Sequence, residues 1–128
     1  MVKSNKPTAA ELEILDVLWE RRQGTVREVH DTINARRPTA YTTVLKQLQI
    51  MHEKGLVKRD EKDKAHVYKP TRSQSQTQKS LVSDLLDKAF RGSALKLMQH
   101  VLETKPATLE ELAEIKRMIA EAEKRGKK

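Results

Sequence analysis

Two helix-start signals near the beginning of the chain constrain its fold more than any other feature. Thr8 is followed three residues later by Glu11, and Thr25 is followed three residues later by Glu28. In each pair the threonine is expected to cap the first turn of a helix, while the glutamate returns a hydrogen bond to the threonine backbone. The sequence therefore predicts one helix after Thr8, ended by Gly24, and a second helix after Thr25.

A third helix is predicted after the Arg36-Arg37-Pro38 break, because the residue before a proline avoids the helical region. Thr39 is expected to cap this helix, and Gly55 stands where a helix terminator should be. The apolar residues of the segment recur at helical spacing and share one face. They are Tyr41, Val44, Leu45, Leu48 and Met51.

Two short apolar runs on either side of a charged turn follow the third helix. The runs Leu56–Arg59 and Ala65–Tyr68 predict the strands of a β-hairpin, and Pro70 ends the second strand. Three helices followed by a hairpin is the element order of a winged helix-turn-helix. We therefore predict a winged-helix domain over residues 7–72, in a mainly α chain.

The rest of the chain, residues 73–125, predicts further amphipathic helices separated by Gly92 and Pro106, the last of them capped by Thr108. These helices are too few to enclose a core, and an apolar face without a partner usually finds one in another chain. We therefore expect a helical dimerisation domain, and the alternative is that these helices pack back on the first domain. The residues expected to form the dimer contact are Leu81, Leu85, Phe90, Leu95, Met98, Val101, Leu102, Leu112, Ile115, Met118 and Ile119.

The distribution of charge favours a nucleic-acid partner. The chain has 128 residues, with 26 Lys and Arg against 18 Asp and Glu, for a net charge of +8. Residues 36–72 hold ten basic and four acidic side chains, whereas residues 11–35 hold three basic and six acidic ones. A surface that contacts phosphates has such a local excess of basic over acidic side chains. The alternative is a solvated basic surface that binds nothing.

In a helix-turn-helix, the second helix of the pair lies in the major groove of DNA. The side of the third helix opposite its apolar face is expected to read base edges, through Thr39, Thr42, Thr43 and Lys46. A second group is expected to contact phosphates, and it consists of Thr25, Arg27, Arg36, Arg37, Lys58, Arg59, Lys62, Lys64 and His66. Taken singly, the threonines are equally typical of the water-facing side of a surface helix. Each basic residue could likewise be a solvated surface charge with no phosphate partner.

Several function classes are excluded or disfavoured by composition. The chain has no cysteine, so it has no thiolate metal site, and its four histidines show no metal-ligand or catalytic spacing. We expect no enzyme activity, no cofactor and no metal. No run approaches the ~20 apolar residues of a membrane span, and the segment Met1–Pro7 lacks an apolar signal core. The sequence therefore predicts a soluble cytoplasmic protein.

With these residues in view, the chain resembles the penicillinase-repressor family of bacterial regulators, the BlaI/MecI/CopY type. The resemblance rests most on Ala40-Tyr41-Thr42-Thr43-Val44, between the predicted helix start and the wing. It rests also on Leu18-Trp19-Glu20, on Thr25-Val26-Arg27-Glu28-Val29, on Lys54-Gly55-Leu56-Val57 and on Ala65-His66-Val67-Tyr68. The resemblance implies a homodimeric winged-helix repressor that binds palindromic operators ahead of resistance or copper-homeostasis genes.

The resemblance covers about residues 7 to 125, and it implies DNA reading by the helix at Thr39 and dimerisation by the helices after Ser73. The copper-responsive branch uses a cysteine cluster, which this chain lacks. In the β-lactam branch, a membrane sensor-protease cuts an Asn-Phe bond in the dimerisation region. Gln99-His100 stands nearest that place here, so we expect release by a different protease specificity or by another signal. The competing function is a winged helix that binds protein and not DNA.

Overall fold

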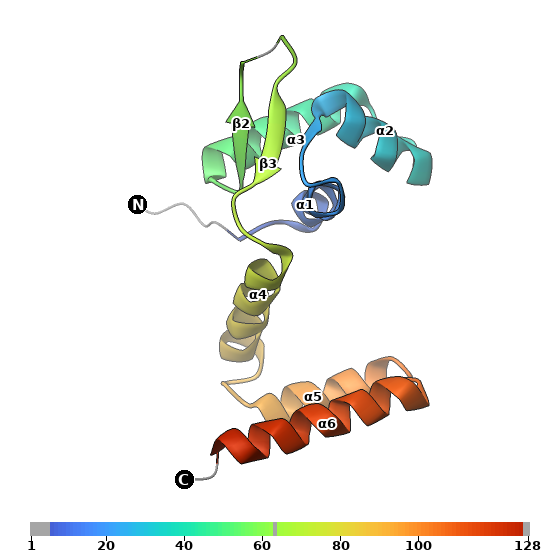
Figure 1. The fold of residues 1–128 in the computed structure, drawn as a ribbon, viewed down its shortest axis with the longest axis vertical. Helices are drawn as coiled ribbons and strands as arrows, with labels where there is room; N and C mark the ends of the chain where they lie inside the picture. Colours follow the sequence, from blue (N-terminus) through green and yellow to red (C-terminus); the bar gives the residue numbers. More distant parts are fainter. Residues whose placement is uncertain (1–5, 63, 127–128) are drawn as a thin grey trace. The chain divides into compact units, whose positions relative to one another are not determined.

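The computed structural model describes residues 6–62 and 64–126, so most of the polar segment Met1–Pro7 lies outside the described residues. Within the described part, the chain forms six α-helices and three short strands (Figure 1). It divides into two compact units, the first ending at Val82 and the second beginning at Ser83. The first unit contains the predicted wing and carries nearly all the buried side chains.

Three helices form the frame of the first unit: α1 (Ala9–Arg21), α2 (Val26–Arg36) and α3 (Tyr41–Lys54). The predicted capping boxes of Thr8 and Thr25 are both present, with the hydroxyl and the glutamate carboxylate each completing its bond. Each box satisfies backbone groups that the first turn of a helix leaves unpaired. The sequence therefore predicted the starts of α1 and α2 correctly.

The end of α1 was predicted at the wrong residue. The chain leaves the helix at Arg22, which has a φ of 77°, and not at Gly24. Gly24 lies in a short strand, where a Cβ atom would stand 3.4 Å from the Val29 side chain and 3.5 Å from the Leu18 side chain. A Cβ atom at these distances would make ordinary van der Waals contact, so Gly24 neither ends α1 nor occupies a position that only glycine fits.

The start of α3 also differs from the prediction. Its N-cap residue is Ala40, which has extended backbone and no side-chain cap bond, and Thr39 lies one residue before it. Gly55 ends the helix as predicted, with a left-handed φ of 82° that a glycine adopts without strain.

The three strands form one antiparallel sheet in the order β1-β3-β2, and Figure 1 shows β2 and β3 as the hairpin that projects beyond the helices. They are β1 (Gly24–Thr25), β2 (Val57–Asp60) and β3 (Val67–Pro70). The predicted hairpin is confirmed, although its strands lie one and two residues further along the chain. The sequence analysis did not predict β1, because a strand of two residues is too short to show an alternation of apolar and polar side chains.

The core of the first unit is formed by side chains from the helices α1, α2 and α3 and from the hairpin strands. Apolar burial of this kind is the main favourable term in folding. The buried apolar residues are Ile14, Leu15, Val17, Leu18, Val26, Val29, Ile33, Val44, Leu48, Met51, Val57 and Tyr68. This core fixes which side of α3 is available to a partner.

Three more helices follow: α4 (Gln74–Ala89), α5 (Ala94–Thr104) and α6 (Leu109–Gly126). The chain reverses direction between α5 and α6 (Figure 1). α4 runs through the division between the two units, and Thr77 is its one buried residue. In the described part of the chain, which includes all of α5 and α6, neither of these two helices contains a buried residue.

Candidate nucleic-acid interface

The exposed side of α3 carries the residues predicted to read bases. Thr42, Thr43 and Lys46 are exposed, whereas Val44 and Leu48 on the opposite side are buried in the core. A helix puts residues three and four apart on one face, so the first two turns present two hydroxyls and one ammonium together. These groups are of the kind that contact base edges in the major groove.

Thr39 does not belong to this exposed face as closely as predicted. It is half-buried in the turn between α2 and α3, where its N–H donates to Asn34 Oδ1 at 2.9 Å. Its hydroxyl donates to the carbonyl of Arg37 at 2.9 Å. The side chain is therefore engaged in forming the turn, although sequence analysis expected it to cap α3.

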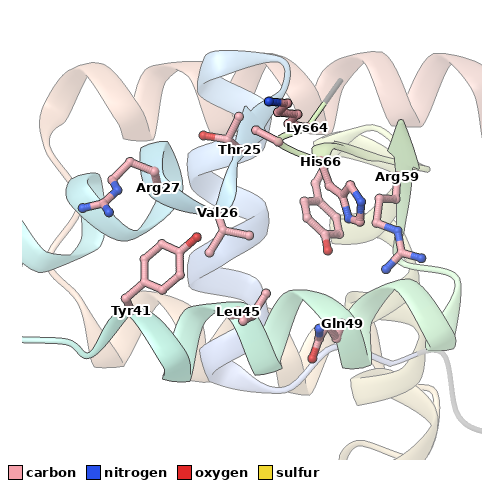
Figure 2. A pocket seen from close by; sticks show the side chains of 11 residues that line it. Thr25, Val26, Arg27, Tyr41, Leu45, Gln49, Arg59, Lys64 and His66 are labelled. Carbon is pink, nitrogen blue, oxygen red and sulfur yellow. The ribbon is translucent and has the colours of Figure 1, made fainter. Parts of the chain in front are cut away.

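A groove of about 300 Å³ opens between α2, α3 and the wing (Figure 2). It brings together five of the predicted phosphate-contacting residues, which come from three separate segments. These five are Thr25, Arg27, Arg59, Lys64 and His66. Four of the five side chains can carry a positive charge, so this part of the surface attracts a polyanion.

Tyr41 forms the α3 wall of this groove, although its spacing places it on the apolar face of the helix. Its exposed fraction is 39%. The guanidinium of Arg27 lies 5.2 Å from the centre of the Tyr41 ring, and the His30 ring meets it edge-on at 5.8 Å. A cation over an aromatic face is attracted by the ring quadrupole, so these contacts hold the ring at the groove.

Arg59 and Glu61 form the main charge contact of the wing. Arg59 Nε donates to Glu61 Oε2 at 2.9 Å. The hydrogen bond of Arg59 to Tyr68 and its bond to Glu61 raise the pKa of the guanidinium above its usual value. His66 Nε2 lies 4.0 Å from the other oxygen of the same carboxylate. Glu61 thus offsets part of the positive charge beside the groove.

The remaining predicted phosphate contacts lie outside the groove. Lys58 and Lys62 are exposed on the wing, and Arg36 is exposed at the end of α2. Arg37 instead pairs with the carboxylate of Glu13 on α1. Arg37, which the sequence analysis predicted to contact phosphate, therefore links the turn before α3 to α1.

Gln49 is a candidate contact that sequence analysis missed. It is exposed on α3 and lines the groove two turns after Tyr41, with Leu45 between them (Figure 2). It stands three residues after Lys46 and seven after Thr42, so helical spacing alone could have placed it on the same face. Glutamine side chains recognise adenine through paired hydrogen bonds.

The residues that the structure describes also bear on membrane insertion and metal binding. No helix there is long and apolar enough to cross a membrane. No group of three or more His, Asp or Glu side chains in residues 6–62 and 64–126 could hold a metal ion.

Comparison with known families decides the class of protein. The sequence profile of the penicillinase repressor family matches residues 7–121, which is most of the chain. This chain belongs to the penicillinase repressor family. The resemblance seen in the sequence is therefore confirmed, and the match spans both units of the structure.

Relatives within the penicillinase repressor family carry a regulatory description. Two proteins from strains of Mycobacterium tuberculosis, each described as transcriptional regulator BlaI, are 35% identical to the chain over 125 residues. The alignment covers 96% of this chain and 89% of each relative. The chain is accordingly a transcriptional regulator of the repressor type, and the prediction that it is not an enzyme is confirmed by these relatives.

A solved structure supports the penicillinase repressor fold. It is described as the solution structure of the DNA binding domain of the repressor BlaI. It matches with a TM-score of 0.52 and 24% sequence identity, covering 59% of this chain and 92% of that chain. The predicted mainly α, winged-helix fold is confirmed.

Proposed function

We propose that this chain represses transcription by binding a palindromic DNA operator as a homodimer. The observation that carries the proposal is the exposed hydroxyl and ammonium face of α3, which stands beside a cationic groove in a member of a repressor family. In this proposal α3 enters the major groove, and bound protein blocks RNA polymerase. The regulated genes would form a β-lactam-resistance operon or a related stress operon.

Base reading is assigned to the N-terminal half of α3. Thr42 and Thr43 offer hydroxyls to either base type and methyl groups to thymine, and Lys46 reaches guanine or a phosphate. Gln49 extends the same face toward the wing. Thr39 contributes mainly by holding the turn, because its hydroxyl already donates within the protein.

Phosphate contacts are assigned to the groove and to the outer side of the wing. Arg27 on α2 and Lys64 and His66 on the wing line the groove, while Lys58 and Lys62 extend from the hairpin. Such contacts set position and register without reading sequence. They also make affinity fall steeply with salt, because each neutralised phosphate releases a counterion.

Dimerisation is assigned to residues 73–125, with residues 7–72 as the DNA-binding domain. Support comes from exposure: all eleven residues predicted for the dimer contact are exposed or half-buried in the single chain. Leu95 has an exposed fraction of 79% and Met118 of 57%. Apolar patches of this kind mark contact sites between chains. Two half-sites would then be read about 10 base pairs, or a multiple, apart.

The inducing signal is proposed to act on the helices after Gly92. Gln99 and His100, nearest the place of the family's Asn-Phe bond, lie within α5. A helical segment must unfold locally before a protease can cut it, so release by a membrane sensor-protease would need opening of α5. A repressor of chromosomal genes works in the cytoplasm, where we place this protein.

A salt titration of DNA binding tests the proposal. Binding would be measured to the DNA upstream of the chain's own gene and to random DNA of equal length, with the mass in solution determined in parallel. Tighter, saturable and salt-sensitive binding to the upstream DNA by a dimer is the expected result. Failure to bind either DNA at low salt would overturn it and favour the alternative, a winged helix that binds protein.

A further inference from the structure

We propose that His30 is a positioning residue that holds the entrance of α3, and that it does so as the doubly protonated imidazolium. Preference for the operator over random DNA would then weaken as the ring loses its proton. The inference rests on the proposed function, because it concerns how the base-reading helix is held. His30 lies on α2 and its side chain is 14% exposed.

The His30 ring bridges α2 and the turn that leads into α3. Its Nε2 lies 2.8 Å from the carbonyl oxygen of Thr39, and its Nδ1 lies 2.9 Å from Asp31 Oδ1. Both distances are those of full hydrogen bonds. The ring also meets Tyr41, the first residue of α3, edge-on. One side chain thus contacts both the turn and the helix that follows it.

The two partners of the ring decide its proton count. A backbone carbonyl oxygen accepts and cannot donate, and an ionised carboxylate such as that of Asp31 also only accepts. A neutral imidazole has one N–H, so it could donate to only one of these oxygens and would turn a lone pair toward the other. Both bonds form together only when Nδ1 and Nε2 each carry a proton.

The other charged groups around His30 come from three elements. Arg27, one turn earlier on α2, directs its guanidinium over the Tyr41 ring. Arg37 in the turn contacts the Thr39 hydroxyl at 3.5 Å and pairs with Glu13 of α1. Asp31 supplies the negative charge at the ring itself. The positive groups beside His30 are therefore paired with other partners, while its own nitrogens face only oxygen acceptors.

The position of Thr39 affects the base-reading face of α3, because the two are joined by only a few backbone bonds. Thr39 directly precedes Ala40, whose carbonyl accepts from the N–H groups of Thr43 at 3.1 Å and Val44 at 3.3 Å. These are the first bonds of α3, so movement of the turn shifts the turn of helix that carries Thr42 and Thr43. Misplacement by about an ångström is enough to weaken a bidentate or hydroxyl contact to a base.

An Asp31→Asn variant makes the sharpest test, because an asparagine amide can donate to Nδ1 while Nε2–H still donates to Thr39. The neutral ring would then keep both contacts. Affinity for the upstream DNA and for random DNA would be measured from about pH 5.5 to about pH 8.5, the range in which histidine switches act. We expect the ratio of the two affinities to fall about three- to tenfold with rising pH in the unaltered chain and to stay flat in the variant.

Two further variants separate this effect from general charge. His30→Gln should give a low, pH-independent ratio, since glutamine cannot supply two donors to both oxygens in the same geometry. His66→Gln removes a titratable cation from the groove, so it should lower affinity for both DNAs alike. The pH dependence of their ratio should remain in that variant.

Ring nitrogen NMR of the free protein gives a readout that does not need an operator. We expect the amides of Thr43 and Val44 to shift together with the appearance of the second ring N–H of His30 as the pH is lowered. A neutral ring at a pH where operator preference is already maximal would overturn the inference. If neither DNA is preferred at any pH, the proposed function fails, and the NMR titration still decides the state and contacts of His30.

Discussion

Lys54, the last residue of α3, places its ammonium 2.7 Å from the carboxylate of Glu11 in the first turn of α1. Glu11 is 2% exposed, and the same carboxylate accepts from the backbone of Thr8 in the capping box. The pair therefore joins the far end of the base-reading helix to the start of the chain's first helix. Burial by itself raises the pKa of Glu11, but the bonds from Lys54 and Thr8 and the charge of Lys54 lower it by more, so the net shift is downward.

Replacing Glu11 by glutamine tests this pair, because glutamine keeps the capping box and removes only the charge. We expect a loss of about 2 kcal/mol in the free energy of unfolding at neutral pH, measured by urea denaturation. A carboxylate with a lowered folded pKa stabilises above its unfolded pKa, and that contribution disappears as pH falls through the folded value. The difference in stability between the two proteins should therefore begin to shrink as the pH falls below about 4.3, the ordinary glutamate value, and vanish below the lowered folded pKa. Glu20→Gln, at an exposed site of α1, is the control, and a difference that persists in acid would contradict the assignment.

Lys46 and Lys62 should behave differently if one reads bases and the other meets phosphate. Lys46→Ala is expected to weaken operator binding by about 1–3 kcal/mol while random DNA is affected less. Lys62→Ala should weaken both about equally and reduce the salt slope by about one unit. Titrations at several salt concentrations distinguish the two patterns. Equal loss on both DNAs for Lys46→Ala would rule out its base-reading role.

Tyr41 should support DNA binding through its ring and not through its hydroxyl. Tyr41→Phe keeps the surface over which Arg27 lies, so little change is expected. Tyr41→Leu removes a cation–π contact of about 0.5–1 kcal/mol and frees Arg27, so affinity should fall about two- to fivefold. Fluorescence anisotropy with labelled operator measures both. If the two variants bind equally well, the ring does not orient Arg27 for DNA.

Glu61 should restrain DNA binding, since its carboxylate occupies Arg59 and lies near His66. Glu61→Gln is expected to raise affinity for operator and random DNA about two- to fivefold at low salt, with the gain shrinking as salt is added. Glu110→Gln makes the same charge change at the exposed start of α6 and serves as the comparison. Should both variants gain equally, the effect belongs to net charge and not to the wing.

Ile119 should lie in the dimer contact, since it is apolar and 55% exposed on α6. Ile119→Glu would bury a charge on association, so analytical ultracentrifugation should show monomer where the unaltered chain is a dimer. Operator affinity should then drop toward that of a single half-site. Ala113→Glu introduces the same side chain at another exposed site of α6 and should remain dimeric. A dimeric Ile119→Glu would move the contact elsewhere.

Local signals explain how much of this fold the sequence predicts. The capping boxes at Thr8, Thr25 and Thr108 act within four residues, and each is present in the structure. The buried side of α3 followed from helical spacing. The role of Thr39 and the contacts of Tyr41 could not be predicted, because their partners come from α2 and from the turn, and helical spacing does not reveal such contacts.

The residues of the candidate interface could be predicted by type, but their arrangement could not. Sequence charge picked out Arg27, Arg59, Lys64 and His66, and the groove brings them together. The same reasoning chose Arg37, which lies outside the groove and pairs with Glu13. The sequence shows which residues are basic, but only the folded chain shows which of them form an ion pair with an acidic neighbour.

Because neither α5 nor α6 contains a fully buried residue, pairing of two chains would supply apolar contacts that a single chain lacks. The stability of these helices would then depend on the concentration of repressor in the cell, because association of two chains follows the law of mass action. At low abundance more of the copies would be single chains, with the apolar faces of α5 and α6 exposed. Strong operator binding would then begin only above the concentration at which two chains pair.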